Sequence, residues 1–397
     1  MGTETSRDEG VGRKPTTGVT RRSLLQAASV GVFCVPGTSS SSGVPNVWSR
    51  PGSRAVAGEP VTQIPAGSGS LHLSRGGTYK LAGDVFGPIL ITGQGVVLDG
   101  DGHSITSGYD VAGITLVGAT DAGIRNVTVV PRDSGIVGHR VGAVSLTDVT
   151  VYGGADGVRF DDEIIASTVP VDPDRQAGTD ATSQTAETPT TVQASTVVVV
   201  NAAGHGFSLD STAGTFSQCQ AIHCGRNEEY HGIKSASPSG LTLDQCVVSG
   251  AGGYGYLFTD GTGETAGAQS AVVVSNSLAR DCGASGFFAM RVDDVRLACD
   301  WSTGNREHGF GLLNNGQVTL VRNSAVDNGQ YGHLMESNTS ARYFELRAAD
   351  NGIEDLAARA GATEVTDGSE VDASTCVKPK ELTEATLPPV TSKTGAV

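Results

Sequence analysis

The chain has 397 residues, of which 42 are acidic and 27 are lysine or arginine, so its formal net charge is −15. Glycine supplies 55 residues, while aromatic residues make up only 5%. This much glycine argues against a helical bundle, because each glycine inside a helix costs stability. The acidity argues against binding to the phosphate backbone of nucleic acids.

The first sixty residues read as an export signal followed by a linker. Arg21-Arg22 follows a polar, basic region and precedes the short apolar run 27–35, an order that resembles a twin-arginine export signal. We expect residues 1–36 to be this signal and residues 37–60, rich in Ser, Gly and Pro, to be a flexible linker. The alternative is a disordered basic tail with a short buried helix. The signal predicts a secreted or cell-surface protein, and no other apolar run is long enough for a membrane span.

Self-similarity is the strongest signal in the sequence. A glycine followed by an apolar residue, or by histidine at Gly332, recurs with a basal step of 22 or 23 residues and is here called the anchor glycine. The anchor glycines are Gly113, Gly135, Gly157, Gly206, Gly232, Gly255, Gly286, Gly309, Gly332 and Gly352. One such unit cannot bury its apolar face alone, but stacked units can. We therefore predict an all-β solenoid of about ten or more coils over residues 61–360, followed by a disordered polar tail at 361–397.

These repeats resemble right-handed parallel β-helix proteins, the superfamily typified by pectate lyases and including NosD-type periplasmic proteins. The entry segments Gly77 to Leu81 and Gly95 to Ile105 carry the same resemblance, which covers about Val61 to Asp355. The resemblance implies a right-handed parallel β-helix. It implies no single activity, because many activities share this fold.

One step of the repeat is anomalous. Gly157 and Gly206 are 49 residues apart, and residues 161–191 hold seven acids against the single Arg175. We predict an acidic loop insertion there. Loops of this kind on a rigid scaffold often shape a binding site, although a solvated insertion is the plain alternative.

The repeat register predicts which side chains share a face. Equivalent residues on stacked coils lie about 4.8 Å apart, and side chains alternate along a strand, so positions two and four after the anchor glycine point outward. The coils around Gly157, Gly206 and Gly232 gather charged residues at these positions and just before the glycine. The candidate catalytic residues are Asp156, Arg159, Asp161, His205, Asp210 and Lys234, and the candidate substrate-binding residues are His139 and His231.

These residue types suit chemistry on an acidic glycan. Arg159 and Lys234 can bind a uronate carboxylate, Lys234 with a lowered pKa can act as a base, and His205 or His231 can transfer a proton. Asp161 and Asp210 on adjacent coils repel unless a proton or cation separates them, which makes them candidate ligands of Ca²⁺ as a cofactor. The alternative is that these acids and bases pair across coils and only favour solubility.

A narrower resemblance concerns the hydrolytic mechanism. Gly204-His205-Gly206 followed by Gly232-Ile233-Lys234 is similar to the Gly-His-Gly and Arg-Ile-Lys segments of polygalacturonases. In that family three aspartates on neighbouring coils perform inverting hydrolysis. Here Asp156 lies one coil before His205, but Ser134 stands two coils before, and Lys234 takes the place of the arginine. These departures argue against that mechanism.

A group of apolar side chains is also predicted to point outward. Its members are Leu257, Phe288, Met290, Leu313 and Leu334. Because exposed apolar patches are uncommon on monomers, we expect the C-terminal tail or a turn loop to cover them. The alternatives are a subunit interface and a sugar-stacking surface.

Seven cysteines remain to be placed. Cys34 lies in the predicted signal, and the others show no spacing typical of a zinc site. We expect small buried core residues, with disulfides possible in an oxidising compartment and their pairing open. The six are Cys219, Cys224, Cys246, Cys282, Cys299 and Cys376.

The sequence thus predicts an exported β-helix that binds, and as a lyase or hydrolase cleaves, an extracellular uronate-containing polysaccharide. The alternative is a non-catalytic surface or scaffold protein that binds a protein or glycan partner. The oligomeric state and the presence of catalysis stay open.

Overall fold

The structure is a computed structural model, and it describes residues 61–108, 110–161, 190–260, 270–358, 362–364 and 376. The predicted signal and linker at 1–60 lie outside these residues. So do residues 162–189 of the predicted acidic insertion and all of the predicted tail except 362–364 and Cys376. The described residues form no helix long and apolar enough to cross a membrane.

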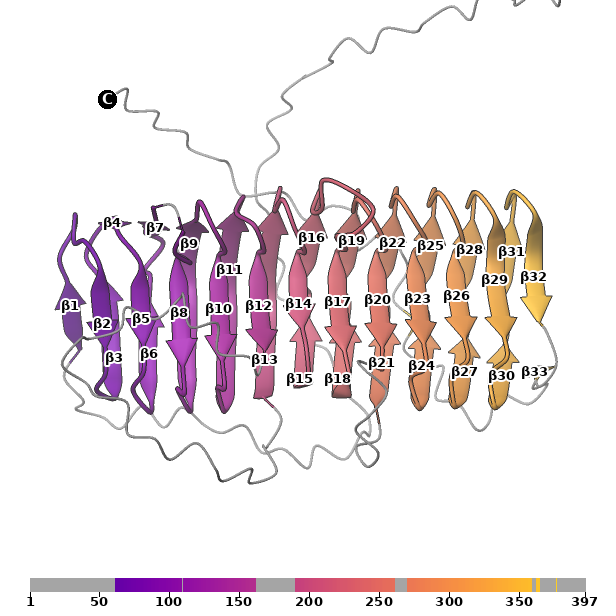
Figure 1. Ribbon diagram of the computed structural model, residues 1–397, viewed down its shortest axis with the longest axis horizontal. Helices are drawn as coiled ribbons and strands as arrows, with labels where there is room; N and C mark the ends of the chain where they lie inside the picture. Colours follow the sequence, from indigo (N-terminus) through magenta and orange to yellow (C-terminus); the bar gives the residue numbers. More distant parts are fainter. Residues whose placement is uncertain are drawn as a thin grey trace, which may run out of the picture. The chain divides into compact units, whose positions relative to one another are not determined.

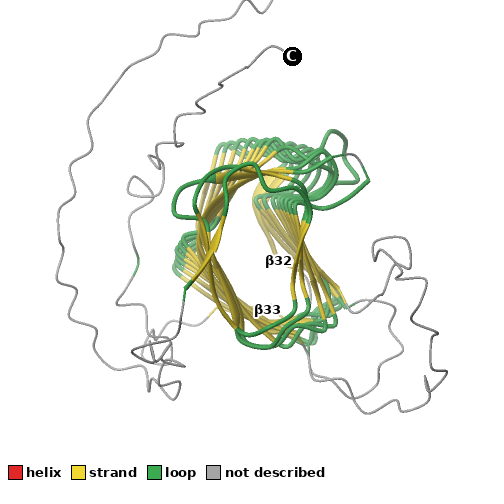
Figure 2. Cartoon of the chain, turned by 90° about the vertical axis from the view of Figure 1, so that its left-hand side faces the viewer, coloured by secondary structure: helices red, strands yellow, loops and turns green. Residues whose placement is uncertain are grey.

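The described residues fold into strands that stack in a row (Figure 1) and superpose around a shared core when viewed along that row (Figure 2). One sheet has twelve strands, and the ten anchor glycines stand at the start of its last ten strands. These are β2 (Leu71–Leu73), β5 (Ile89–Ile91), β8 (Ile114–Val117), β10 (Ile136–His139), β12 (Val158–Asp161), β14 (Phe207–Leu209), β17 (Ile233–Ala236), β20 (Tyr256–Thr259), β23 (Phe287–Met290), β26 (Phe310–Leu313), β29 (Tyr331–Glu336) and β32 (Glu354–Ala358).

The remaining strands form a 21-stranded sheet, which supplies up to two further strands to each coil. They are β1 (Thr62–Ile64), β3 (Gly77–Leu81), β4 (Val85–Phe86), β6 (Val96–Asp99), β7 (Ser104–Thr106), β9 (Ala122–Val130), β11 (Ala143–Tyr152), β13 (Thr190–Val200), β15 (Thr212–Ser217), β16 (Gln220–Ile222), β18 (Ser239–Asp244), β19 (Val247–Ser249), β21 (Ala271–Ser275), β22 (Leu278–Arg280), β24 (Asp294–Ala298), β25 (Trp301–Thr303), β27 (Gln317–Val321), β28 (Ser324–Val326), β30 (Ser340–Phe344), β31 (Arg347–Ala349) and β33 (Ala362–Glu364).

Adjacent coils pair in parallel, as the repeat predicts. In the twelve-stranded sheet β12 pairs with β10 and β14, and β17 pairs with β14 and β20. The solenoid therefore has about eleven turns, and the predicted fold class is confirmed. β33 pairs with β30, so residues 362–364 extend the stack into the segment expected to be a tail.

Three bends close each coil. The coil that contains β23, β24 and β25 turns at Arg291, Cys299 and Gly304, whose φ angles are 61°, 60° and 65°. These residues occupy the left-handed region, in which a single residue can turn the chain sharply. The following coil repeats the pattern 23 residues later at Asn314, Arg322 and Asp327. The 23-residue period is thus the length of three strands and three such corners.

The anchor glycines are required by close approach between coils. A Cβ atom on Gly206 would lie 2.5 Å from the carbonyl oxygen of Gly232, and one on Gly255 would lie 2.5 Å from the carbonyl oxygen of Gly286. Real Cβ atoms do not approach that closely. The glycine column is therefore a column of steric contacts between successive backbones.

A substitution in this column tests that explanation. Gly255→Ala should lower the free energy of unfolding by about 1–3 kcal/mol, because the added methyl group overpacks a rigid site. Thermal unfolding of the full chain measures the change. Gly123→Ala in β9 is the matched control, because its Cβ would meet Val97 at an ordinary 3.5 Å. Equal melting temperatures for the two variants would contradict the steric account.

The core between the sheets contains an aromatic stack on four consecutive coils. Tyr256, Phe287, Phe310 and His333 face inward with nearly parallel rings, at centroid distances of 4.5, 4.9 and 4.8 Å. Offset stacking of this kind adds to the burial of apolar surface. Both ring nitrogens of His333 are buried without a partner, and burial lowers its pKa to about 4, so its imidazole is neutral.

The prediction that cysteines occupy small buried positions is confirmed for four of them. Cys219, Cys224, Cys246 and Cys282 are buried and free. Burial raises the pKa of Cys224 to about 11 and that of Cys282 to about 12, which makes both thiols poor nucleophiles. The remaining pairing, open from sequence alone, is a disulfide between Cys299 and Cys376.

In the C-terminal coils, asparagines occupy the corner positions that hold small residues in earlier coils. In each, Oδ1 accepts an N–H from the preceding coil and Nδ2 donates to a carbonyl of that coil, so a buried amide satisfies two backbone groups at a corner. The buried members are Asn305, Asn315, Asn323, Asn328 and Asn338, and the partly buried Asn351 makes the same contacts.

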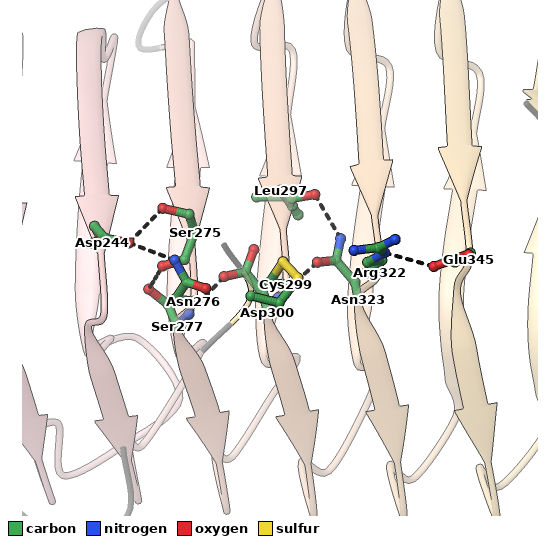
Figure 3. Close-up of a disulfide and its surroundings, with 11 residues drawn as sticks. Asp244, Ser275, Asn276, Ser277, Leu297, Cys299, Asp300, Arg322, Asn323 and Glu345 are labelled. Atoms are coloured by element: carbon green, nitrogen blue, oxygen red, sulfur yellow. Dashed lines mark hydrogen bonds and ion pairs between the residues drawn. A yellow bond between two sulfur atoms is a disulfide. The ribbon is translucent and has the colours of Figure 1, made fainter. Parts of the chain in front are cut away.

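Asp300, next to the disulfide, occupies an asparagine position in this scheme (Figure 3). Its Oδ1 accepts the Ser277 N–H at 2.9 Å, but Oδ2 is buried without a partner. At the same position of the next coil, Nδ2 of Asn323 donates to the Leu297 carbonyl. The strand register places Val274 opposite Leu297, so the Val274 carbonyl is the acceptor that lacks a donor at Asp300. A protonated Asp300 supplies the missing donor. Burial raises the pKa of Asp300 well above its usual value, with the charge of Asp244 as a further cause, which favours that protonated form.

Exchanging the side chains at Asp300 and Asn323, which occupy the same position on adjacent coils, tests the protonated carboxyl. A raised pKa in the folded state means that Asp300 contributes stability at low pH and loses it as the pH rises above the unfolded value near 4. Asp300→Asn should therefore raise the melting temperature at pH 7, with a smaller gain at pH 4. Asn323→Asp should lower the melting temperature at pH 7, with a smaller loss at pH 4. Melting curves of both variants at the two pH values are the measurement, and a gain for Asp300→Asn that does not depend on pH would contradict the protonated carboxyl.

Candidate functional site

The candidate site lies on the outward face of the twelve-stranded sheet, on the strands β10, β12, β14 and β17. Register aligns Val137, Arg159, Ser208 and Lys234 in one row across these strands, and His139 with Asp161 in another. Val158 and Phe160 alternate with Arg159 and Asp161 and are fully buried. The inward and outward columns predicted from the repeat are therefore confirmed on these strands.

Arg159 joins two of the predicted carboxylates. Its Nε lies 2.8 Å from Asp161 Oδ2, and its Nη1 lies 3.8 Å from Asp156 Oδ2. The other oxygen of Asp161 lies 2.6 Å from Nδ1 of His139. All four side chains are partly or fully withdrawn from water. The ion pairs of Arg159 are therefore less screened than pairs on an open surface.

His139 differs from the sequence-based expectation. It was predicted to contact substrate, but only 1% of its side chain is exposed, and its contact is with Asp161. Its Nε2 is buried without a partner. The structure therefore places His139 behind Asp161, where it orients that carboxylate.

Lys234 and Asp210 form a second ion pair on the next coils. Lys234 Nζ lies 3.8 Å from Asp210 Oδ2, and the other oxygen of Asp210 accepts the N–H of Ala236 at 3.1 Å. Both side chains remain about one third exposed. This pair is more accessible than Arg159, Asp156 and Asp161.

The residues just before the anchor glycines form a ladder that links the coils. Asp156 Oδ1 accepts the backbone N–H of His205 at 2.8 Å, and His205 Nδ1 accepts that of His231 at 3.0 Å. His231 Nδ1 in turn accepts the N–H of Tyr254 at 3.2 Å. We call Asp156, His205, His231 and Tyr254 the imidazole ladder.

Burial and the charge of Lys234 set the protonation of this ladder. Burial raises the pKa of Asp156, against the lowering effects of the His205 N–H, Arg159 and Lys234. Burial, with Lys234 as a further cause, lowers the pKa of His205 to about 4. Burial, then His205 and Lys234, lower that of His231 to about 3. His231 lies three residues before Lys234 at the start of β17, so the ladder runs next to the Lys234–Asp210 pair.

The two carboxylates proposed to hold calcium each contact a cation of the chain. Asp161 meets Arg159 and Asp210 meets Lys234, so the expected repulsion between them is balanced by side chains. The described residues contain no group of three acidic, histidine or cysteine side chains that could hold a metal ion. Calcium binding by Asp161 and Asp210 stays a prediction.

The outward apolar group lies beside this site on β20 to β29. Phe288 is 9% exposed and Leu334 is 7% exposed, although both occupy outward positions. Phe288 stacks on Tyr254 at 4.7 Å and fills the space above Gly311, which has no side chain. Neighbours in the sheet thus cover part of the group. Its predicted cover by the C-terminal tail falls outside the described residues.

A comparison with families of known proteins identifies the fold independently. Residues 205–375 match the family described as right handed beta helix region. The chain is a right-handed parallel β-helix. No curated protein sequence matches it.

Solved structures show where this β-helix lies among known folds. It is similar to a variant of the catalytic domain of a GH87 α-1,3-glucanase bound to nigerose, with a TM-score of 0.51, 10% identity, and 77% of this chain and 64% of that chain covered. A variant of the periplasmic alginate epimerase AlgG gives a TM-score of 0.49 with 9% identity, covering 78% of each chain. Pectate lyase Pel9A gives 0.42 with 14% identity, covering 74% of this chain and 82% of that one. The β-helix spans less than two thirds of the glucanase chain, and these likenesses show the fold alone.

Two aromatic residues of this β-helix join the site without having been predicted there. Tyr254 continues the imidazole ladder, with its ring 5.3 Å from that of His231. Tyr230, 37% exposed, meets the His205 ring edge-on at 5.3 Å. Tyr254 occupies the same repeat position as His205 and His231, which could have revealed it. Tyr230 lies in a longer turn loop, for which the repeat gives no register.

Proposed function

We propose that the site binds and cleaves an extracellular polysaccharide that contains uronate residues. The observation that carries the proposal is the position of Asp156, a mostly buried carboxyl with a raised pKa, beside the side-chain cations Arg159 and Lys234 on one outward sheet face. A carboxyl that holds its proton can act as a general acid, and the two cations can bind a uronate carboxylate.

Hydrolysis is the reaction that these groups support best. Asp156 gives its proton to the glycosidic oxygen as the bond from that oxygen to the anomeric carbon breaks. Asp210 accepts a proton from the water that attacks the same carbon, so each carboxyl changes its protonation once. The two carboxyls differ in environment, since Asp156 is mostly buried whereas Asp210 is about one third exposed and paired with Lys234.

The fold supports a carbohydrate substrate. The glucanase domain with a TM-score of 0.51 is named for action on an α-1,3-glucan, so this fold accommodates enzymes that act on polysaccharides. The uronate component rests on Arg159 and Lys234 alone. Lys234 also offers a second reaction, removal of a proton next to a uronate carboxylate, which gives elimination in place of hydrolysis.

The alternative is a non-catalytic protein that binds a glycan or protein partner. It is favoured by the internal pairing of the site, because Arg159, Asp161, Lys234 and Asp210 already meet opposite charges within the chain. The site also holds one more carboxylate than it has cations, since the third carboxylate is that of Asp156. Binding of an acidic polymer must therefore exchange internal ion pairs for new ones.

Export remains part of the proposal. The Cys299–Cys376 disulfide supports an oxidising compartment, where such bonds persist, and Arg21-Arg22 supports a twin-arginine route to it. Loss of secretion after Arg21→Lys together with Arg22→Lys is the expected result. An unchanged level of secreted protein would contradict this route.

Cleavage is tested with the full chain on polygalacturonate and alginate, with and without calcium. We expect new reducing ends, and a rate at least about a hundredfold lower in Asp156→Asn, because a general acid contributes that much or more. Lys80→Ala is the control, since Lys80 pairs with Asp101 on an early coil away from the site. The rate should fall as the pH rises through the raised pKa of Asp156, because the carboxyl then loses the proton that it must donate.

The products separate the possible outcomes. Unsaturated ends, which absorb ultraviolet light, indicate elimination, whereas saturated ends indicate hydrolysis. Polymers that remain intact throughout, with or without calcium, would contradict cleavage and favour the non-catalytic alternative.

A further inference from the structure

We propose that His205 and His231 act as neutral hydrogen-bond donors to glycan oxygen atoms, through Nε2–H, and not as bases or proton shuttles. The identity of the ligand rests on the proposed function. The state of the two rings rests on the ladder alone.

The ladder fixes which ring nitrogen carries the proton. A nitrogen that accepts a hydrogen bond carries no proton, and Nδ1 of both histidines accepts a backbone N–H from the next coil. A neutral imidazole must then carry its proton on Nε2. The stacked backbone thus selects one tautomer for both rings, because the hydrogen bond at one ring nitrogen decides which nitrogen carries the proton.

Protonation to the cation is opposed by the hydrogen bonds of the ladder, by the charge of Lys234 and by burial. A second proton would have to enter Nδ1 and break the bond to the next coil. Lys234 adds a positive charge on the same face, and burial withdraws both rings from water. The other groups that face the rings are the tyrosines Tyr230 and Tyr254 and, at the start of the ladder, Asp156.

The two Nε2–H groups are available to a ligand. No described residue accepts a hydrogen bond from either group, and neither atom belongs to the buried polar atoms without a partner. The rings lie on adjacent coils, with their centroids 5.1 Å apart. The face next to Lys234 therefore presents two neighbouring N–H donors, on rings tilted by 37° to each other. Such donors suit hydroxyl, ring and glycosidic oxygens as well as carboxylates.

His308 provides a matched contrast within the same column. It stands in the same position before an anchor glycine, but its Nδ1 is buried without a partner. Its ring contacts Tyr331 at 5.4 Å, outside the candidate site. His308 shares the burial of the ladder histidines and lacks their hydrogen bond to the next coil.

Nitrogen NMR of the full chain labelled at histidine tests the state of the rings. We expect both His205 and His231 to show the Nε2–H tautomer with no change from pH 8 to pH 5, while free histidine titrates near 6.5. Assignment uses the spectra of His205→Phe and His231→Phe. An Nδ1–H tautomer, or titration of either ring above pH 5, would overturn the proposal.

Binding of hexameric oligogalacturonate and oligomannuronate tests the ligand. Loss of one donor in His231→Phe should weaken binding about tenfold, and His308→Phe should leave it unchanged. Circular dichroism establishes that the variants fold. If the wild-type chain binds an oligomer and His231→Phe binds it equally well, the donor role is wrong. If the wild-type chain binds neither oligomer, the proposed function and the glycan ligand are both wrong. The NMR result still decides the state of the rings.

Discussion

Backbone contact at the anchor glycines is the constraint on which the rest of the structure depends. A Cβ atom at these positions would collide with the carbonyl of the next coil, at 2.5 Å for Gly206 and Gly255. Because a side chain at these positions would push the paired coils apart, each glycine has to stand opposite the glycine position of the next coil, which fixes the register. That register places every later residue of the strand in a column with its counterparts.

The candidate site follows from this register. Arg159 and Lys234 share a row because both stand two residues after an anchor glycine, and the imidazole ladder exists because its members stand just before one. Side chains in a ladder bond to the backbone of the next coil, which fixes their orientation at the same time as it satisfies an N–H group. Asparagine side chains make the related contact in the opposite direction, to the backbone of the preceding coil, at the corners of the C-terminal coils. Structural and candidate functional residues thus use one kind of contact.

Much of this arrangement is predictable from the sequence. The glycine spacing and the alternation of apolar residues predict the coils and the outward row that holds Arg159 and Lys234. These features depend on local periodicity, which a sequence displays directly. The gathering of charged residues on neighbouring strands follows from the same periodicity.

Other features depend on contacts that periodicity does not encode. The burial of His139 depends on packing around Asp161, and Tyr230 reaches His205 from a turn loop with no register. The bond between Cys299 and Cys376 joins a corner to a segment outside the repeat. The protonation of Asp300 depends on a carboxyl standing where its column neighbour has an amide. Each of these required the positions of side chains in space.

The central claim is that the outward face of the twelve-stranded sheet is the surface that meets a glycan. Hydrogen–deuterium exchange of the full chain with and without an oligogalacturonate or oligomannuronate tests this most directly. The account predicts slower exchange in peptides that contain β12, β14, β17 and β20, with no change in the strands of the 21-stranded sheet on the same coils. Protection confined to the 21-stranded sheet would contradict it.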